Sequence, residues 1–148
     1  MKSILDSTLN HQEIEKKLPH AGKMCLLHEV ISADINSLKA LAISHQDTDN
    51  PLRIKGKIAI VNGIEYAAQA MAIHGTLLSE HSDSPRSGYI ATVRNIELKV
   101  PFFPENNSPL IIEVKQLMSD NNGFTYQFFI SCEQEALISG KITVFLTL

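Results

Sequence analysis

The chain has 148 residues, 44% of them hydrophobic, and a formal net charge of −3 at pH 7. This length and composition fit one globular domain over residues 1–148, and the acidic balance argues against nucleic acid as a partner, because the phosphate backbone selects for a broad basic face. The chain has no uninterrupted apolar run of about 18 residues, the length that indicates a membrane span, and no signal-peptide pattern at its start, so we expect a cytoplasmic protein.

The two cysteines, Cys25 and Cys132, stand apart in the sequence. Neither belongs to a CxxC pair or to a histidine cluster at ligand spacing, so the sequence indicates neither a disulfide scaffold nor a zinc site. We expect reduced core thiols, and no metal or cofactor.

The first predicted elements are a short helix and a hairpin. Asn10 and Glu13 can form a capping box that opens a helix, which Pro19 then stops. Extended runs over Cys25–Ala33 and Leu38–His45 predict two strands, because the four residues between them are typical of turns.

The central segment is a predicted helix over Gly63–Ser79, after a long loop from Gln46 to Val61. This helix is apolar nearly all the way round, so it has to be buried. Glu65 is the exception, because it places a carboxylate in the first turn. A carboxylate at the mouth of a buried helix must be capped, paired or used chemically. Asn62 lies three residues before Glu65, so a capping box is the structural alternative to a catalytic role.

Only strands are predicted after this helix. The first covers Gly88–Val100, and alternation of apolar and polar residues predicts three more, near 110–115, 124–132 and 138–148. Residues 120–123 have the composition of a hairpin turn. The order of helix, two strands, long apolar helix and four strands predicts an α+β fold, in which one antiparallel sheet wraps around one long central helix.

This arrangement resembles the hotdog fold, and three motifs resemble those of the 3-hydroxyacyl-[acyl-carrier-protein] dehydratases of fatty-acid synthesis. The motifs are Leu18-Pro19-His20, the following Met24-Cys25-Leu26-Leu27-His28-Glu29-Val30, and the helix start Gly63-Ile64-Glu65-Tyr66-Ala67-Ala68-Gln69-Ala70. Two further segments are similar to a divergent branch of bacterial aryl-polyene and related pathways: Gly88-Tyr89-Ile90 and Val100-Pro101-Phe102-Phe103-Pro104. The resemblance covers residues 15 to 148. It implies a hotdog dimer and a lyase that removes water from a 3-hydroxyacyl thioester.

The chain departs from this family at one catalytic position. The family has a histidine on the loop fourteen residues before the helix acid, and here that position is Pro51. Dehydration needs a base for the α-proton, an acid for the departing hydroxide and donors for the enolate oxygen. The resemblance therefore implies dehydratase activity less firmly than it implies the fold.

The candidate catalytic residues are Glu65 and His20. Glu65 can supply one proton-transfer group, and the resemblance places the Leu-Pro-His loop at the mouth of the active site, where His20 would titrate near neutral pH. The alternative for His20 is a loop histidine that orders the turn after Pro19. Free backbone N–H groups around Asn62, Gly63 and Ile64 would bind the thioester oxygen, since the first N–H groups of a helix lack helical partners.

Three other side chains have weaker claims. Gln69 lies four residues after Glu65 and shares its helix face, so it could orient the carboxylate or bind substrate; the alternative is a buried amide that satisfies backbone groups. His45 is a weaker candidate for the missing histidine. His74 lies about half a turn away from Glu65 and is expected to point elsewhere.

A basic stripe is predicted before the central helix. Arg53, Lys55 and Lys57 occupy alternate positions, so an extended segment would put all three on one side. Such a stripe would suit an acidic acyl carrier protein that delivers its substrate on a phosphopantetheine arm. The alternative is a solvated loop without a partner.

Three functions follow from these residues. The first is a 3-hydroxyacyl-[acyl-carrier-protein] dehydratase or a dehydratase subunit. The second is a hotdog acyl-thioesterase, in which one helix carboxylate activates water and no loop histidine is needed. The third is a non-catalytic partner subunit that stabilises an active hotdog dehydratase. We expect either a homodimer or a heterodimer with another hotdog subunit.

Overall fold

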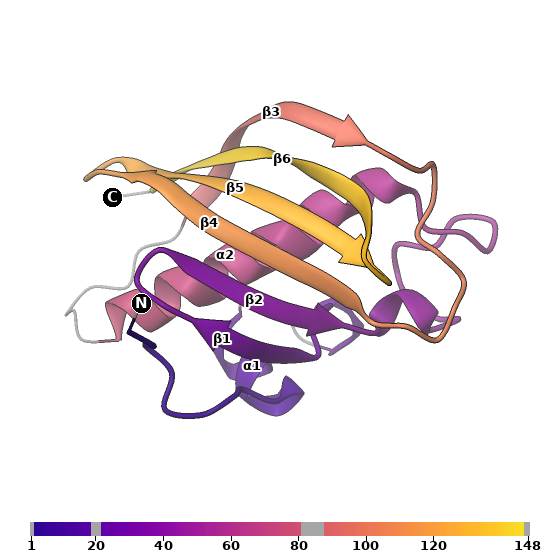
Figure 1. The fold of residues 1–148 in the computed structure, drawn as a ribbon, viewed down its shortest axis with the longest axis horizontal. Coiled ribbons are helices and arrows are strands. Elements are labelled where there is room, and N and C mark those ends of the chain that lie inside the picture. The colour runs from indigo at the N-terminus through magenta and orange to yellow at the C-terminus, as the bar shows by residue number, and fades with distance from the viewer. Residues whose placement is uncertain (1, 19–21, 81–87, 147–148) are drawn as a thin grey trace.

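A curved antiparallel sheet wraps around one long helix in the computed structural model, which describes residues 2–18, 22–80 and 88–146 (Figure 1). The helix is α2, Gly63–Ser79, and a short helix, α1, His11–Lys17, lies beside strand β1. The strands are β1 Glu29–Ala33, β2 Ser37–Ala42, β3 Gly88–Leu98, β4 Leu110–Ser119, β5 Gly123–Cys132 and β6 Glu135–Leu146. Three 3-10 turns complete the elements: η1 Gly22–Met24, η2 Ser44–Gln46 and η3 Ile60–Asn62.

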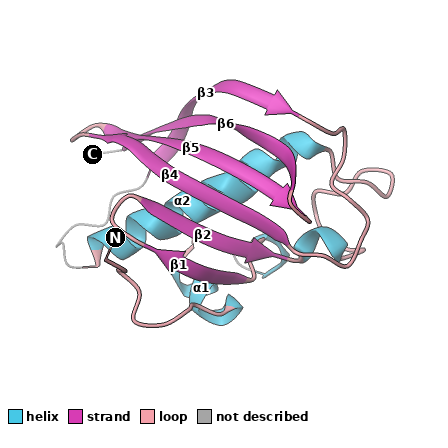
Figure 2. Ribbon diagram, viewed as in Figure 1, coloured by secondary structure: helices cyan, strands magenta, loops and turns pink. Residues whose placement is uncertain are grey.

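The six strands form a single sheet in the order β1-β2-β4-β5-β6-β3, and neighbouring strands are antiparallel. The predicted α+β hotdog fold is confirmed by this topology, with one sheet on one side of a single central helix (Figure 2). None of the helices in the described part of the chain is long and apolar enough to cross a membrane.

The core lies between α2 and the concave face of the sheet. On the helix Tyr66, Ala70 and Ile73 are completely buried, as the apolar pattern of this segment predicts. They pack toward β2, β4 and β5. On β4 and β5 the inward positions alternate with exposed ones, so Ile112 and Phe128 are completely buried.

A buried hydrogen-bond relay fixes the second half of α2 to the sheet. His74 Nε2 lies 2.8 Å from the Asp34 carbonyl oxygen, which can only accept, so Nε2 carries the hydrogen. His74 Nδ1 is then the acceptor for the Tyr126 hydroxyl at 2.6 Å, and Gln116 donates to the same hydroxyl at 3.2 Å. His74 therefore faces the sheet, away from Glu65, as predicted.

The two edges of the sheet differ. Residues before α1 pair with β1: Ile4 N–H donates to Ala33 O at 3.0 Å, and Leu9 and Val30 exchange two backbone hydrogen bonds. No described residue pairs with the outer edge of β3, where Val93 and Leu98 expose apolar side chains. One sheet edge is therefore available for another chain.

The first predicted hairpin is shorter than expected. The prediction of a strand over Cys25–Ala33 was wrong at its start, because β1 begins only at Glu29. Leu26 N–H instead donates to the Gln69 side chain at 2.9 Å, and Leu26 O accepts from the Ser44 hydroxyl at 2.8 Å. The second strand ends at Ala42, because the chain then turns into η2.

Candidate functional site

Glu65 lies in the first turn of α2, half-buried, and it is not part of a capping box. The Asn62 side chain makes no capping bond to the helix; it donates from Nδ2 to Ala59 O at 3.1 Å. Asn62 N–H also donates to Ala59 O, at 3.0 Å. The structural alternative for Glu65 was therefore wrong, because η3 leads directly into α2 and uses these groups itself. The capping box predicted at Asn10 and Glu13, by contrast, is present.

Gln69 connects Glu65 to the segment after η1. Its Nε2 donates to Met24 O at 2.7 Å and lies 3.4 Å from Glu65 Oε1, while its Oε1 accepts from Leu26 N–H. The amide is 2% exposed, so it both satisfies buried backbone groups and touches the carboxylate. The structural alternative for Gln69 is confirmed, although its backbone partners lie outside the strands, while a role in orienting Glu65 or binding substrate stays a prediction.

A groove runs beside the N-terminus of α2. The segment before η3 pairs with the segment after β3, since Phe103 N–H donates to Ile58 O and Ile60 N–H donates to Pro101 O, both at 3.0 Å. The groove between them measures about 420 Å³ and is lined by Ala59, Ile60, Val61, Leu98, Lys99, Val100 and Pro101. It opens next to the uncovered edge of β3, and most of its lining is apolar.

Gly63 permits the close approach of α2 to the sheet. A Cβ at this position would lie 2.8 Å from Ile138 Cγ2 and 3.1 Å from Ile130 Cδ1, closer than side chains normally pack. Gly63 therefore sets how deeply the first turn, with Glu65, sits against β5 and β6.

The sequence predicted free backbone N–H donors at the helix start, and this prediction was wrong for Asn62 and Gly63. Asn62 N–H bonds to Ala59 O, and Gly63 N–H bonds to the carbonyls of Ile60 and Val61. The 3-10 turn η3 supplies these acceptors, and a helix preceded by such a turn has fewer orphan donors.

Pro51, at the position of the family's loop histidine, is exposed in a turn. The buried polar residue of this loop is its neighbour Asn50. Asn50 Nδ2 donates to Ser44 O at 2.8 Å and lies 3.3 Å from the Tyr66 hydroxyl, which also bonds to Ser44 Oγ at 2.9 Å. This network ties the loop to α2, and burial raises the pKa of Tyr66, so its hydroxyl stays protonated near neutral pH.

The basic residues before the helix do not form a flat stripe. Lys55 and Gly56 have φ of 53° and 81°, and Ile54 and Lys57 exchange backbone hydrogen bonds around them. The extended segment was therefore predicted wrongly, because these residues form a two-residue hairpin turn. Arg53 donates to three loop carbonyls, those of His45, Asp47 and Gly56. Lys57 lies 4.8 Å above the Phe102 ring.

His20 lies outside the described residues. His45 is buried at 3% exposure, and neither of its ring nitrogens has a hydrogen-bond partner in the part of the chain that the structure describes. Burial is the main cause that lowers the pKa of His45, and the Arg53 guanidinium lowers this pKa further. The nearby Ser108 backbone raises the pKa, although it is too poorly placed to count as a hydrogen-bond partner of the ring. The His45 ring packs against the Phe103 ring, with the ring centroids 6.3 Å apart.

Both cysteines are buried and free, as predicted. Cys25 nevertheless has neighbours that its sequence position does not suggest, since His11 and Glu15 of α1 lie beside it. Spacings of four and ten residues along the chain match no familiar ligand motif, so only the packing of α1 brings these three side chains together.

The arrangement around Glu65 can serve proton transfer on an apolar ligand. A half-buried carboxylate sits at a helix N-terminus, an amide touches it, and an apolar groove lies at the same end of the helix. A carboxylate so placed can accept or return a proton at a bound molecule or at a bound water.

Known proteins share this fold, and one family model matches most of the chain. A family model described as ApeP dehydratase, ApeP-like, matches residues 12–147. The dehydratase heterocomplex ApeI:P from Xenorhabdus doucetiae contains a chain that superimposes with a TM-score of 0.81 at 23% identity, over 91% of each chain. A thioesterase from Pseudomonas aeruginosa superimposes with a TM-score of 0.67 at 11% identity, over 98% of this chain and 99% of that one. A hypothetical thioesterase with coenzyme A from Streptococcus pneumoniae gives a TM-score of 0.57 at 11% identity, over 80% and 84%. No curated protein sequence matches the chain.

Proposed function

We propose that this chain acts as a dehydratase or dehydratase subunit on a 3-hydroxyacyl thioester carried by an acyl carrier protein. The chain belongs to the ApeP-like dehydratase family, and this membership supports the proposal. The reaction breaks the bond between the hydroxyl-bearing carbon and its oxygen, removes one α-proton, and gives a 2-enoyl thioester and water. No cofactor takes part.

The position of Glu65 is the observation that carries this proposal. Its carboxylate is not used for capping, touches Gln69, and lies at the end of α2 that adjoins the apolar groove. In the proposal Glu65 and His20 handle the two proton movements: one takes the α-proton and the other protonates the departing hydroxide. Gln69 orients the carboxylate, and its two bonds to the Met24–Leu26 segment hold it in place.

The groove beside η3 would receive the acyl thioester. Its lining is mostly apolar, which suits an acyl chain, and Lys99 lies at its wall. The N–H groups of Asn62 and Gly63 are already bonded, so in this proposal they are not donors to the thioester oxygen. Lys55 and Lys57, together with Arg53 at the base of the same turn, would face the acidic carrier protein.

A second hotdog subunit would complete the site. The outer edge of β3 has no partner among the described residues, and the groove opens beside it. The fold neighbour in the ApeI:P heterocomplex works as one of two different subunits, which supports a heterodimer for this chain as well. In a heterodimer the partner could supply the histidine that Pro51 replaces, and this chain would then act mainly as its structural mate.

The competing function is an acyl-thioesterase. Two fold neighbours are named as thioesterases. In that reaction Glu65 activates a water molecule, which attacks the thioester carbonyl, and the thiol leaves with a proton. Pro51 is compatible with this chemistry because it needs no loop histidine.

The experiment that separates these functions supplies the purified chain with a 3-hydroxyacyl carrier protein and with the corresponding saturated acyl carrier protein, alone and with the hotdog subunit encoded nearest to it. We expect enoyl formation, followed by mass spectrometry of the carrier-bound acyl group. Hydrolysis of both substrates without enoyl formation would establish the thioesterase instead. Enoyl formation that depends wholly on the partner's own acid and histidine would establish the non-catalytic subunit.

A further inference from the structure

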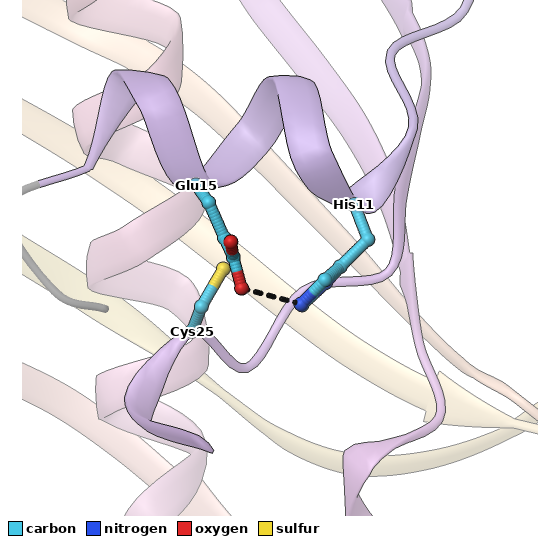
Figure 3. A group of neighbouring side chains, drawn as sticks. All are labelled: His11, Glu15 and Cys25. Carbon is cyan, nitrogen blue, oxygen red and sulfur yellow. Dashed lines mark ion pairs between the residues drawn. The ribbon is translucent and has the colours of Figure 1, made fainter. Parts of the chain in front are cut away.

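A cluster of three side chains outside the Glu65 region has the composition of a metal site. The cluster consists of His11, Glu15 and Cys25, whose ligand atoms all lie within 4.8 Å of one another. His11 and Glu15 are one helical turn apart on α1, and Cys25 comes from the segment after η1 (Figure 3). Figure 3 shows the three side chains converging on one point between the helix and this segment.

The hydrogen bond of His11 decides which ring nitrogen faces the cluster. His11 Nδ1 lies 2.8 Å from the Leu27 carbonyl oxygen, which can only accept, so Nδ1 carries a hydrogen. In the neutral ring Nε2 then presents its lone pair, and it lies 3.0 Å from Glu15 Oε1. A backbone carbonyl that holds the other ring nitrogen in this way is typical of metal-binding histidines.

Two acceptors at this distance need a cation between them. A lone pair on Nε2 and a carboxylate oxygen repel each other, so either a proton or a metal ion must be shared. The Cys25 sulfur at the same point favours a metal ion, because a sulfur ligand would stabilise a bound metal ion but would not stabilise a proton shared between His11 and Glu15.

We propose that His11, Glu15 and Cys25 bind one zinc-class divalent metal ion, with water as the fourth ligand. Imidazole nitrogen, carboxylate oxygen and thiolate are the ligands that Zn²⁺ prefers, at about 2.0–2.3 Å. The side chains of His11 and Glu15 are 39% and 38% exposed, so an ion can enter from solvent, while Cys25 forms the buried wall. On binding, the thiol proton passes to solvent and the metal–sulfur bond replaces it.

Such an ion would cross-link α1 to the segment that Gln69 holds. Cys25 lies between Met24 and Leu26, and the amide of Gln69 bonds to both of these neighbours. The metal would therefore stabilise the folded chain, because the unfolded chain does not hold the three ligands together.

Spectroscopy with Co²⁺ tests the thiolate ligand. The metal-free full chain is titrated with Co²⁺, and we expect one equivalent to give a thiolate-to-metal charge-transfer band together with the visible bands of a four-coordinate ion. Cys25→Ser should abolish the charge-transfer band, and Cys132→Ser, the matched change at the other buried thiol, should keep it. A band that survives in Cys25→Ser, or a spectrum without thiolate absorption in the unchanged chain, would overturn the proposal.

Zn²⁺ affinity tests the other two ligands without touching the core. His11→Gln and Glu15→Gln replace half-buried side chains of α1, 39% and 38% exposed, with polar ones of similar length, so both variants should fold, and each should weaken Zn²⁺ binding at least about tenfold. Glu113→Gln, on the exposed face of β4, is the matched control and should bind as the unchanged chain does. Zn²⁺ should also raise the melting temperature of the unchanged chain. No rise, or equal affinity in all three variants, would show that a shared proton alone joins His11 to Glu15.

Discussion

Gln69 holds its amide nitrogen 3.4 Å from the Glu65 carboxylate while the same amide binds the backbone on both sides of Cys25. The carboxylate is thereby tied to the loop that follows the Leu-Pro-His motif. The Gln69 amide therefore contributes both to the local order at Met24–Leu26 and to the position of the Glu65 carboxylate.

The first prediction concerns Glu65. Glu65→Gln keeps the shape of the side chain but removes the proton-transfer group, so turnover of a 3-hydroxyacyl carrier substrate should fall by on the order of 10²-fold or more. The melting temperature should change little, because glutamine keeps the shape of the side chain and most of its hydrogen bonding. Full activity in Glu65→Gln would show that the chemistry lies elsewhere.

The second prediction concerns Gln69. Gln69→Leu removes the partners of the Leu26 N–H and of Met24 O, and leaving such buried groups unsatisfied costs on the order of 2 kcal/mol of unfolding free energy. Chemical denaturation measures this loss. Activity should fall as well, because Glu65 loses its neighbour. Gln127→Leu, on the half-buried outward face of β5, is a control that should change stability little.

The third prediction concerns His20. If His20 exchanges the second proton, His20→Asn should abolish dehydration while the assembly stays folded, and the unchanged protein should show an activity limb in the range where histidine titrates. His28→Asn, an exposed histidine of the same region, is the control. Activity retained in His20→Asn would assign the second group to the partner subunit.

The fourth prediction concerns the pH dependence of stability. The folded-state pKa of His45 is lowered, chiefly by burial, so the unfolded chain binds a proton that the folded chain resists. Stability should therefore be full above the ordinary histidine pKa of about 6.5 and fall as the pH drops below it, by at most about 1.4 kcal/mol per pH unit for this group. His74, whose pKa is also lowered by burial, acts in the same direction.

Denaturation between pH 7 and pH 5 isolates the contribution of His45. His45→Leu loses no hydrogen bond of the ring within the described residues, so it should fold and show a shallower decline on acidification. An unchanged slope in His45→Leu would mean that His45 is accessible to protons in the folded chain.

The fifth prediction concerns assembly. We expect a dimer, with itself or with a hotdog partner, through the open edge of β3. Val93→Lys places a charge on the apolar surface of this edge and should shift sedimentation at micromolar concentration toward the monomer, whereas Met118→Lys, exposed at the end of β4, should not. A monomer in the unchanged protein, with and without a partner, would contradict the proposed interface.

The sequence predicted the long-range arrangement well where periodicity decides it. α2 and the alternating strands β4, β5 and β6 lie where their apolar patterns placed them, because each pattern has to match one buried face. The capping box at Asn10 and Glu13 is equally local, and it is present.

Predictions failed where a distant side chain took over backbone groups. The residues from Cys25 to His28 have strand-like composition, but Gln69 and Ser44 bind the backbone of Leu26, so no strand forms there. Asn62 has the identity of a helix cap, yet η3 supplies the acceptors instead. The grouping of His11, Glu15 and Cys25 depends on how α1 packs, which no spacing rule encodes.

The pairing of residues 4–9 with β1 has a consequence for how far strand addition can proceed. The N-terminal segment bonds to β1 at Ala33 and at Val30, so among the described strands β3 is the edge strand whose outer side has no partner for a foreign strand to displace. Two chains joined β3 to β3 would consume both open edges at once, so growth would stop at a closed pair and not continue into a filament. A deletion that removes residues 2–9 would reopen the second edge, and it would turn a self-limiting assembly into one prone to polymerise.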